Sequence, residues 1–276
     1  MTYYKTVEGG TTTELETDVF YLNQIPDAME RMGWETAPKL MRHWFSITPA
    51  YQFKPKEKIK LIEESATLIP TNLINTNIVK MGWALNYIQV KESVGYLLNN
   101  WATPKGIKLL KKRLGSNTRI GYTDSAIELD SYAQVNSRPI GGTLDTINDY
   151  YGALGKATIK IAVKGYITKV NSRDAFITEM LGIYIKDSYD FSAENEPLGV
   201  WSKNGIMNKT QTLLYMGFYN QNMWKELADG GFSGSVPIYN KNFREWQEKW
   251  NEGGDFIVFS DILWSYPMPN DRVIYL

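Results

Sequence analysis

The chain has 276 residues, enough for one large domain or two small ones, and its 30 basic and 30 acidic residues give a formal net charge of +0. This balance argues against binding to nucleic acid or to an anionic membrane surface. The absence of cysteine excludes disulfides, thiolate catalysis and cysteine-built zinc sites, and the single histidine, His43, excludes a zinc site of several imidazoles in one chain.

Helix signals dominate the first part of the chain. Residues 1–20 are polar and rich in Thr and Gly, which predicts a loose segment. Residues 21–115 are predicted to be helix-rich, because Pro26, Thr36 and Pro104 stand at favoured helix starts and Gly115 at a favoured helix end. The predicted helices cover 26–32, the segment that follows Thr36, 56–65, 89–101 and 104–114, while 77–85 is ambiguous between helix and strand.

The last of these helices has a basic polar face, which carries Lys105, Lys108, Lys111, Lys112 and Arg113. A solvated helix face is the more common meaning of such a run, and a docking face for a partner is the alternative.

Strand signals dominate residues 116–276. Residues 157–170 alternate apolar and polar side chains, which predicts a half-buried strand, and 176–186 predicts a second strand that pairs with it across the turn-like segment 171–174. The remaining predictions are a linker or irregular strands at 116–143, helices at 144–154 and from Asn240, and strands at 197–202, 213–218 and 255–266. We expect an α+β fold with a helix-rich N-terminal half and an antiparallel strand-rich C-terminal half, as two domains or as one unit.

The segment YIKDSYDF at 184–191 combines two carboxylates and a phenol where the second hairpin strand is predicted to end. Because Asp and Ser favour turns, we expect Asp187 and Asp190 to converge there. Two close carboxylates either push their pKa values apart or bind a hard cation. The alternative is that both aspartates only cap a turn, while Tyr189 and Phe191 pack underneath.

These residues define a candidate site. Asp187, Tyr189 and Asp190 are the candidate catalytic residues, and Asp187, Asp190 and Glu194 are the candidate ligands of Mg²⁺. Arg138, on a predicted strand elsewhere, either completes this site from a distance or is hydrogen-bonded scaffolding.

Several segments carry a family resemblance in their order and spacing: 25–34, 40–45, 133–138, 149–155, 185–191 and 198–201. From about residue 20 to its end the chain resembles bacterial proteins of the domain-of-unknown-function 6402 family. The resemblance implies a type VI secretion-associated protein, because such proteins are encoded beside the spike and tip genes of that apparatus. It implies an antibacterial effector or its accessory in competition between bacteria, and it supplies no reaction.

The four residues DSYD at 187–190 are also similar to the Asp-x-Tyr-Asp motif of colicin M-like toxins, which cleave the lipid-linked peptidoglycan precursor and need magnesium. The His and Arg that follow the motif in those toxins are missing here, which removes a phosphate clamp and a proton donor. If the chain is an enzyme, the resemblance implies a metal-assisted hydrolase of the cell envelope.

The expected partners are proteins: a secretion spike or tip component, an effector, or a cognate immunity protein. The alternative to an effector is therefore a non-enzymatic adaptor or chaperone, or an immunity protein that binds a toxin. The N-terminal residues lack the pattern of a signal peptide, and no run approaches 18 apolar residues. We expect a chain made in the cytoplasm, without a transmembrane helix, that a type VI secretion system delivers into a target cell if it is exported.

Overall fold

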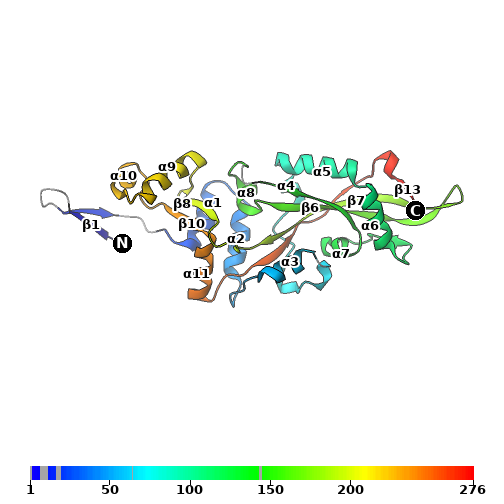
Figure 1. Ribbon diagram of the computed structural model, residues 1–276, viewed down its shortest axis with the longest axis horizontal. Helices are drawn as coiled ribbons and strands as arrows, with labels where there is room; N and C mark the ends of the chain where they lie inside the picture. Colours follow the sequence, from blue (N-terminus) through cyan, green and yellow to red (C-terminus); the bar gives the residue numbers. More distant parts are fainter. Residues whose placement is uncertain (1, 7–11, 17–19, 64, 143–144) are drawn as a thin grey trace. The chain divides into compact units, whose positions relative to one another are not determined.

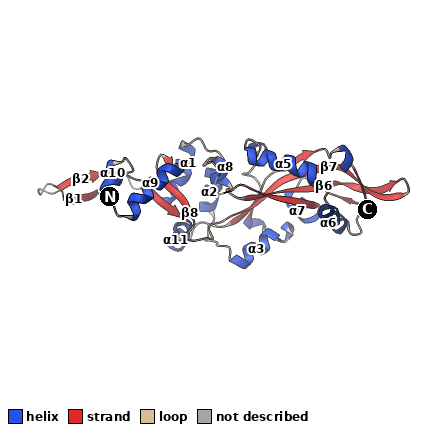
Figure 2. Cartoon of the chain, turned by 45° about the horizontal axis from the view of Figure 1, so that its top comes forward, coloured by secondary structure: helices blue, strands red, loops and turns tan. Residues whose placement is uncertain are grey.

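A computed structural model describes residues 2–6, 12–16, 20–63, 65–142 and 145–276. The chain divides into two compact units, and each unit is assembled from two separate segments. Unit 1 comprises Met1–Tyr51 and Phe191–Gly254, and unit 2 comprises Gln52–Asp190 and Asp255–Leu276. The predicted α+β class is confirmed, with helices concentrated in the N-terminal half and a curled, mixed sheet in the C-terminal half (Figures 1 and 2).

Unit 2 is built around a long hairpin of β6 (Ala157–Val170) and β7 (Arg173–Tyr189). The strands pair antiparallel from Thr158 opposite Lys186 to the turn, where Asn171 and Ser172 have positive φ angles of 50° and 64°. Two consecutive positive φ values give a turn whose twist matches that of the strands, and this confirms the predicted hairpin.

Six shorter strands extend this hairpin into a sheet of order β3-β11-β7-β6-β4, with β5 also beside β6, and β12 and β13 also beside β7. They are β3 (Ile74–Asn75), β4 (Arg119–Ile120), β5 (Gln134–Ile140), β11 (Phe256–Phe259), β12 (Leu263–Ser265) and β13 (Val273–Tyr275). All pairings are antiparallel except that of β3 with β11.

Helices cover both faces of this sheet. Figure 1 shows α5 on one side of the hairpin and α3 and α7 on the other. The helices of unit 2 are α3 (Pro55–Glu63), α4 (Met81–Ala84), α5 (Ile88–Asn100), α6 (Pro104–Leu114), α7 (Ala126–Tyr132) and α8 (Asp149–Ala153). Because both faces are covered, Lys186 of β7 is only 2% exposed, beneath helices instead of facing water.

Unit 1 packs its helices around aromatic side chains. Its helices are α1 (Ile25–Arg31), α2 (Ala37–Ser46), α9 (Lys209–Asn220), α10 (Trp224–Asp229) and α11 (Asn240–Trp250). Its strands are β1 (Thr2–Thr6), β2 (Thr12–Glu16), β8 (Pro197–Ser202), β9 (Gly205–Ile206) and β10 (Val236–Tyr239). Trp44 is fully buried, and its ring meets Phe45, Phe191 and Phe243 edge to face, each at 5.2 Å between ring centroids.

Three predictions of local structure are wrong. The predicted strand at 213–218 lies in helix α9, which begins with a capping box between Asn208 and Gln211. A short apolar run does not separate strand from helix by its periodicity, whereas the capping box marks a helix start. The segment 116–143, predicted to be a linker or irregular strands, contains the strands β4 and β5 but also the helix α7, which was not expected. The single strand predicted at 255–266 is split into β11 and β12.

Within residues 1–20, predicted to be loose, β1 and β2 pair antiparallel, and the predicted helix at 144–154 begins outside the described residues. Among the residues that the structure describes, no helix has both the length and the apolar character needed to span a membrane.

Candidate functional site

The Asp187–Asp190 motif lies mostly inside a strand. Asp187, Ser188 and Tyr189 pair with β11 of the sheet, and the strand ends only after Tyr189. The expectation that these residues break the strand as a turn is therefore wrong. The reason is that β11 supplies hydrogen-bonding partners that outweigh the local preference of Asp and Ser for turns.

Asp190, directly after the strand, forms an ion pair with Lys58 of α3, at 2.7 Å between Oδ2 and Nζ. The Asp190 side chain is only 4% exposed and the Lys58 side chain 32%. Next to it, the Tyr189 ring stacks on Phe256 at 5.2 Å between centroids, and burial raises the pKa of the Tyr189 phenol. Both residues thus fix the end of β7, to α3 and to β11 respectively.

Asp187 remains partly exposed, on the face of the sheet opposite Lys186. Burial raises the pKa of Asp187 well above its usual range, and the neighbouring Asp190 raises it further. On α8, Tyr150 is fully buried, and its hydroxyl has no hydrogen-bond partner among the described residues. Burial raises the pKa of Tyr150, and the charges of Asp187 and Asp145 add to this.

Of the two remaining candidates, Glu194 and Arg138, only Arg138 belongs to the same unit as Asp187 and Asp190. Glu194 belongs to unit 1, whereas Asp187 and Asp190 belong to unit 2. Arg138 lies on β5, where its guanidinium stacks over the ring of Tyr96 at 4.3 Å. In the part of the chain that the structure describes, no three His, Asp or Glu side chains are grouped so that they could hold a metal ion.

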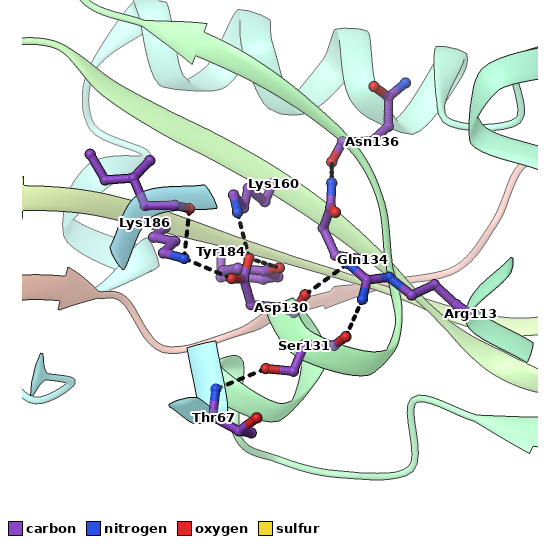
Figure 3. Close-up of polar contacts among 10 residues, drawn as sticks. Thr67, Arg113, Asp130, Ser131, Gln134, Asn136, Lys160, Tyr184 and Lys186 are labelled. Atoms are coloured by element: carbon purple, nitrogen blue, oxygen red, sulfur yellow. Dashed lines mark hydrogen bonds and ion pairs between the residues drawn. The ribbon is translucent and has the colours of Figure 1, made fainter. Parts of the chain in front are cut away.

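A separate polar network of the hairpin is centred on Asp130 of α7 (Figure 3). Oδ1 of Asp130 accepts hydrogen bonds from Lys160 at 2.6 Å and from the Tyr184 hydroxyl at 2.9 Å. Oδ2 accepts one from Lys186 at 3.0 Å, and Lys186 also donates to the carbonyl of Ile62 at 2.9 Å. The network therefore connects both hairpin strands with α7 and α3.

Charge in this network is unbalanced, because two ammonium groups share one carboxylate. Asp130 and Lys186 are only 4% and 2% exposed. Burial lowers the pKa of Lys186, the attraction of Asp130 opposes this, and the repulsion of Lys160 adds to it. Removing Asp130 would leave both ammonium groups without a counter-charge in a largely dry site, which is costly.

Further hydrogen bonds hold α7 in place (Figure 3). The Ser131 hydroxyl accepts from the Thr67 amide at 3.0 Å, and Arg113 of α6 donates to the Ser131 carbonyl. On β5, the Gln134 amide donates to the Asn136 carbonyl at 3.0 Å. The position of α7, and with it that of Asp130, is thus fixed from several segments.

An open cleft of about 450 Å³ lies against the other side of α7. Its lining residues come from β4, the loop after it, and α7, and they include Arg119, Tyr122, Glu128 and Tyr132. The Tyr122 ring is covered by the Arg119 guanidinium at 4.1 Å and by the Lys164 ammonium at 5.2 Å, and its hydroxyl donates to Glu179. Tyrosine and arginine, both present in this lining, are enriched at protein interfaces.

Asp130 and the cleft are not predicted from the sequence, because both depend on α7, a helix in a segment predicted to be a linker or irregular strands. One local signal was present: Ser125 stands three residues before Glu128, the spacing of a capping box. In the structure the Ser125 hydroxyl accepts a hydrogen bond from the Glu128 amide and begins α7.

A double-mutant cycle tests the ion pair of the motif. We expect Lys58→Met and Asp190→Asn to show a coupling of about 1–2 kcal/mol in urea unfolding, because the carboxylate is buried. The matched control is the exposed pair of Arg42 with Glu30, for which about 0.2–1 kcal/mol is expected. Equal coupling in both cycles would contradict a structural role for Asp190.

Comparison with known proteins gives one match. A family model described as "Family of unknown function (DUF6402)" matches residues 20–275. No curated protein and no solved structure matches the chain.

Proposed function

The chain belongs to the DUF6402 family of unknown function, and from this premise we propose that it is an accessory protein of a type VI secretion system that acts by binding a protein partner. The partner would be a spike or tip component, or an effector that the apparatus carries. The association with secretion is supported by the resemblance of this chain to DUF6402 proteins that are encoded beside spike and tip genes.

The observation that supports binding over catalysis is the use that the fold makes of the Asp187–Asp190 motif. Asp190 is neutralised by Lys58, and Tyr189 packs flat against Phe256, so two of the three candidate catalytic side chains hold the sheet together. A catalytic carboxylate or phenol has to reach a substrate in a cleft. The cleft beside α7 instead presents exposed tyrosines and a cation.

Growth of a bacterial host distinguishes an accessory from a toxic hydrolase. We expect no growth arrest when the chain is produced in the cytoplasm, or with an added export signal in the periplasm. The same result is expected for Asp187→Asn combined with Asp190→Asn. Lysis on export by the wild type, abolished in a double variant that still melts at the wild-type temperature, would overturn the proposal in favour of an envelope hydrolase.

Partner capture tests whether the chain binds a protein of the secretion system. The tagged full chain is expected to recover a spike or tip component, or an effector, from the producing cell. The matched bait is the same chain with a cleft residue changed, Tyr132→Ala, which is exposed and should fold normally. Recovery of none of these components by the wild type would contradict the accessory role.

A further inference from the structure

Helix α6 presents an unusually one-sided charge. Between Glu92 and Asp124 the sequence has no acidic residue and six basic ones, five of which lie in α6. The buried side of α6 carries Gly106, Leu110 and Leu114. The exposed lysines of α6 are Lys105, Lys108, Lys111 and Lys112, and none of them forms an ion pair within the described part of the chain.

The position of these lysines is fixed. Thr103 caps the helix by accepting from the Gly106 amide at 3.1 Å, and Gly115 ends it with a φ of 52°. The fifth cation, Arg113, points inward and donates to the Ser131 carbonyl at the end of α7. The helix therefore fixes the backbone positions of four unpaired lysines, and only their side chains have to be ordered on binding.

The same helix borders the cleft beside α7. Through Arg113 it contacts α7, which lines one side of the cleft, and it also packs on β4, which lines the other. The cleft adds Arg119 to the cations of α6, and it adds two aromatic side chains, Tyr122 and Tyr132, with 39% and 58% of their surfaces exposed. We call the lysine face of α6 and the neighbouring cleft, taken together, the α6–cleft surface.

We propose that the α6–cleft surface docks an acidic segment of a partner protein. Charge complementarity carries this assignment: the unpaired lysines of α6 attract carboxylates, and Tyr122 and Tyr132 offer the aromatic contacts common at protein interfaces. The proposal rests on the partner-binding role proposed above and specifies the chemistry of the partner.

Two other polyanions fit this surface less well. Nucleic acid presents a long row of phosphates, and a chain with 30 acidic and 30 basic residues gives such a polyanion no net attraction. A membrane surface would require exposed apolar side chains beside the lysines, and among the large apolar side chains of α6 none is exposed. A short acidic segment needs only the few cations that α6 supplies, so it is the occupant that these observations favour.

The test uses the full chain and a fluorescent twelve-residue polyglutamate peptide, with binding followed by anisotropy at low salt. The test variant replaces Lys105, Lys108, Lys111 and Lys112 by glutamine. The matched control replaces Lys56, Lys80, Lys156 and Lys169, four exposed lysines outside α6, and so changes the net charge equally. We expect saturable binding that the test variant weakens by about tenfold or more, while the control weakens it less than about twofold.

A third variant, Tyr132→Ala, is expected to weaken peptide binding as well, because the ring lines the cleft. Equal losses in the test and control variants would overturn the proposal, since binding would then follow net charge alone. Tighter α6-dependent binding of a twelve-nucleotide oligothymidine, or of vesicles with anionic lipid, would overturn it in favour of that ligand. If α6-dependent peptide binding is observed but no secretion component is captured, the accessory role is contradicted while the docking of an acidic segment is retained.

Discussion

Replacing Asp130 by asparagine is expected to lower the free energy of unfolding by about 3–5 kcal/mol, the cost of removing one partner of a buried ion pair. The substitution keeps the shape of the side chain but removes the only negative charge near the Lys160 and Lys186 ammonium groups in this network. Lys186 is then left with the Ile62 carbonyl as an uncharged partner. The measurement is urea unfolding at neutral pH, followed by circular dichroism.

The control for this variant is Asp124→Asn, which changes an exposed aspartate six residues earlier and should alter stability by no more than about 0.5 kcal/mol. A loss in Asp130→Asn no larger than that of the control would show that the network contributes nothing to stability.

The pH dependence of the Asp130→Asn variant follows from Lys186. Burial lowers the pKa of this lysine in the folded chain, so the unfolded chain binds more protons and stability rises with pH between the folded and unfolded pKa values. Without Asp130 the attraction that opposes this shift is lost. The penalty of the variant is therefore expected to be largest at neutral pH and to shrink as pH rises toward the ordinary lysine pKa of about 10.4. A penalty that grows with pH would contradict this account.

Replacing Trp44 by alanine is the second large effect, with an expected loss of about 3–5 kcal/mol in unit 1. The ring is fully buried against Phe45, Phe191 and Phe243. It also lies where a side chain on Gly253 would stand, since a Cβ placed there would be 2.3 Å from the ring. Segments of unit 1 that are distant in sequence meet at this ring. The cavity that the substitution leaves is therefore lined by several segments, and a shift of one side chain does not fill it.

Trp250→Ala is the control for the Trp44 variant, because its ring is 52% exposed and should contribute about 0.5 kcal/mol or less. Thermal unfolding of both variants and the wild type gives the comparison. Equal melting temperatures for the two tryptophan variants would contradict the assignment of Trp44 as the centre of this core.

Elements whose signals are local were predictable from the sequence. The hairpin of β6 and β7 follows from alternation and from a turn at Asn171, and α6 follows from its Thr103 cap and Gly115 end. The α+β class follows from the distribution of such segments along the chain.

The features that the sequence did not predict depend on contacts between segments that are distant along the chain. The predicted strand ends at residue 186, whereas β7 continues to Tyr189. The reason is that β11, which pairs with these last residues, lies about 70 residues further along the chain. Lys160 and Lys186 stand at the polar positions of alternating strands, which predicts that they face solvent. That face of the sheet is covered by α7 and α3, to which the two lysines donate hydrogen bonds. A charged side chain in a strand predicts exposure by default, and its burial can be inferred only when a counter-charge such as Asp130 is known to face it.

The interleaving of the two units has a consequence for synthesis on the ribosome. The first segment of unit 1 leaves the ribosome well before its complement, because roughly 140 residues of unit 2 are translated in between, which takes about 7–30 s at typical elongation rates. During this interval Trp44 and its neighbours on the nascent chain have no core to enter. Unit 2 in turn waits for the strands of Asp255–Leu276, so neither unit is complete until residues after 190 have been translated. In this interval the nascent chain exposes apolar side chains, to which a holding chaperone can bind.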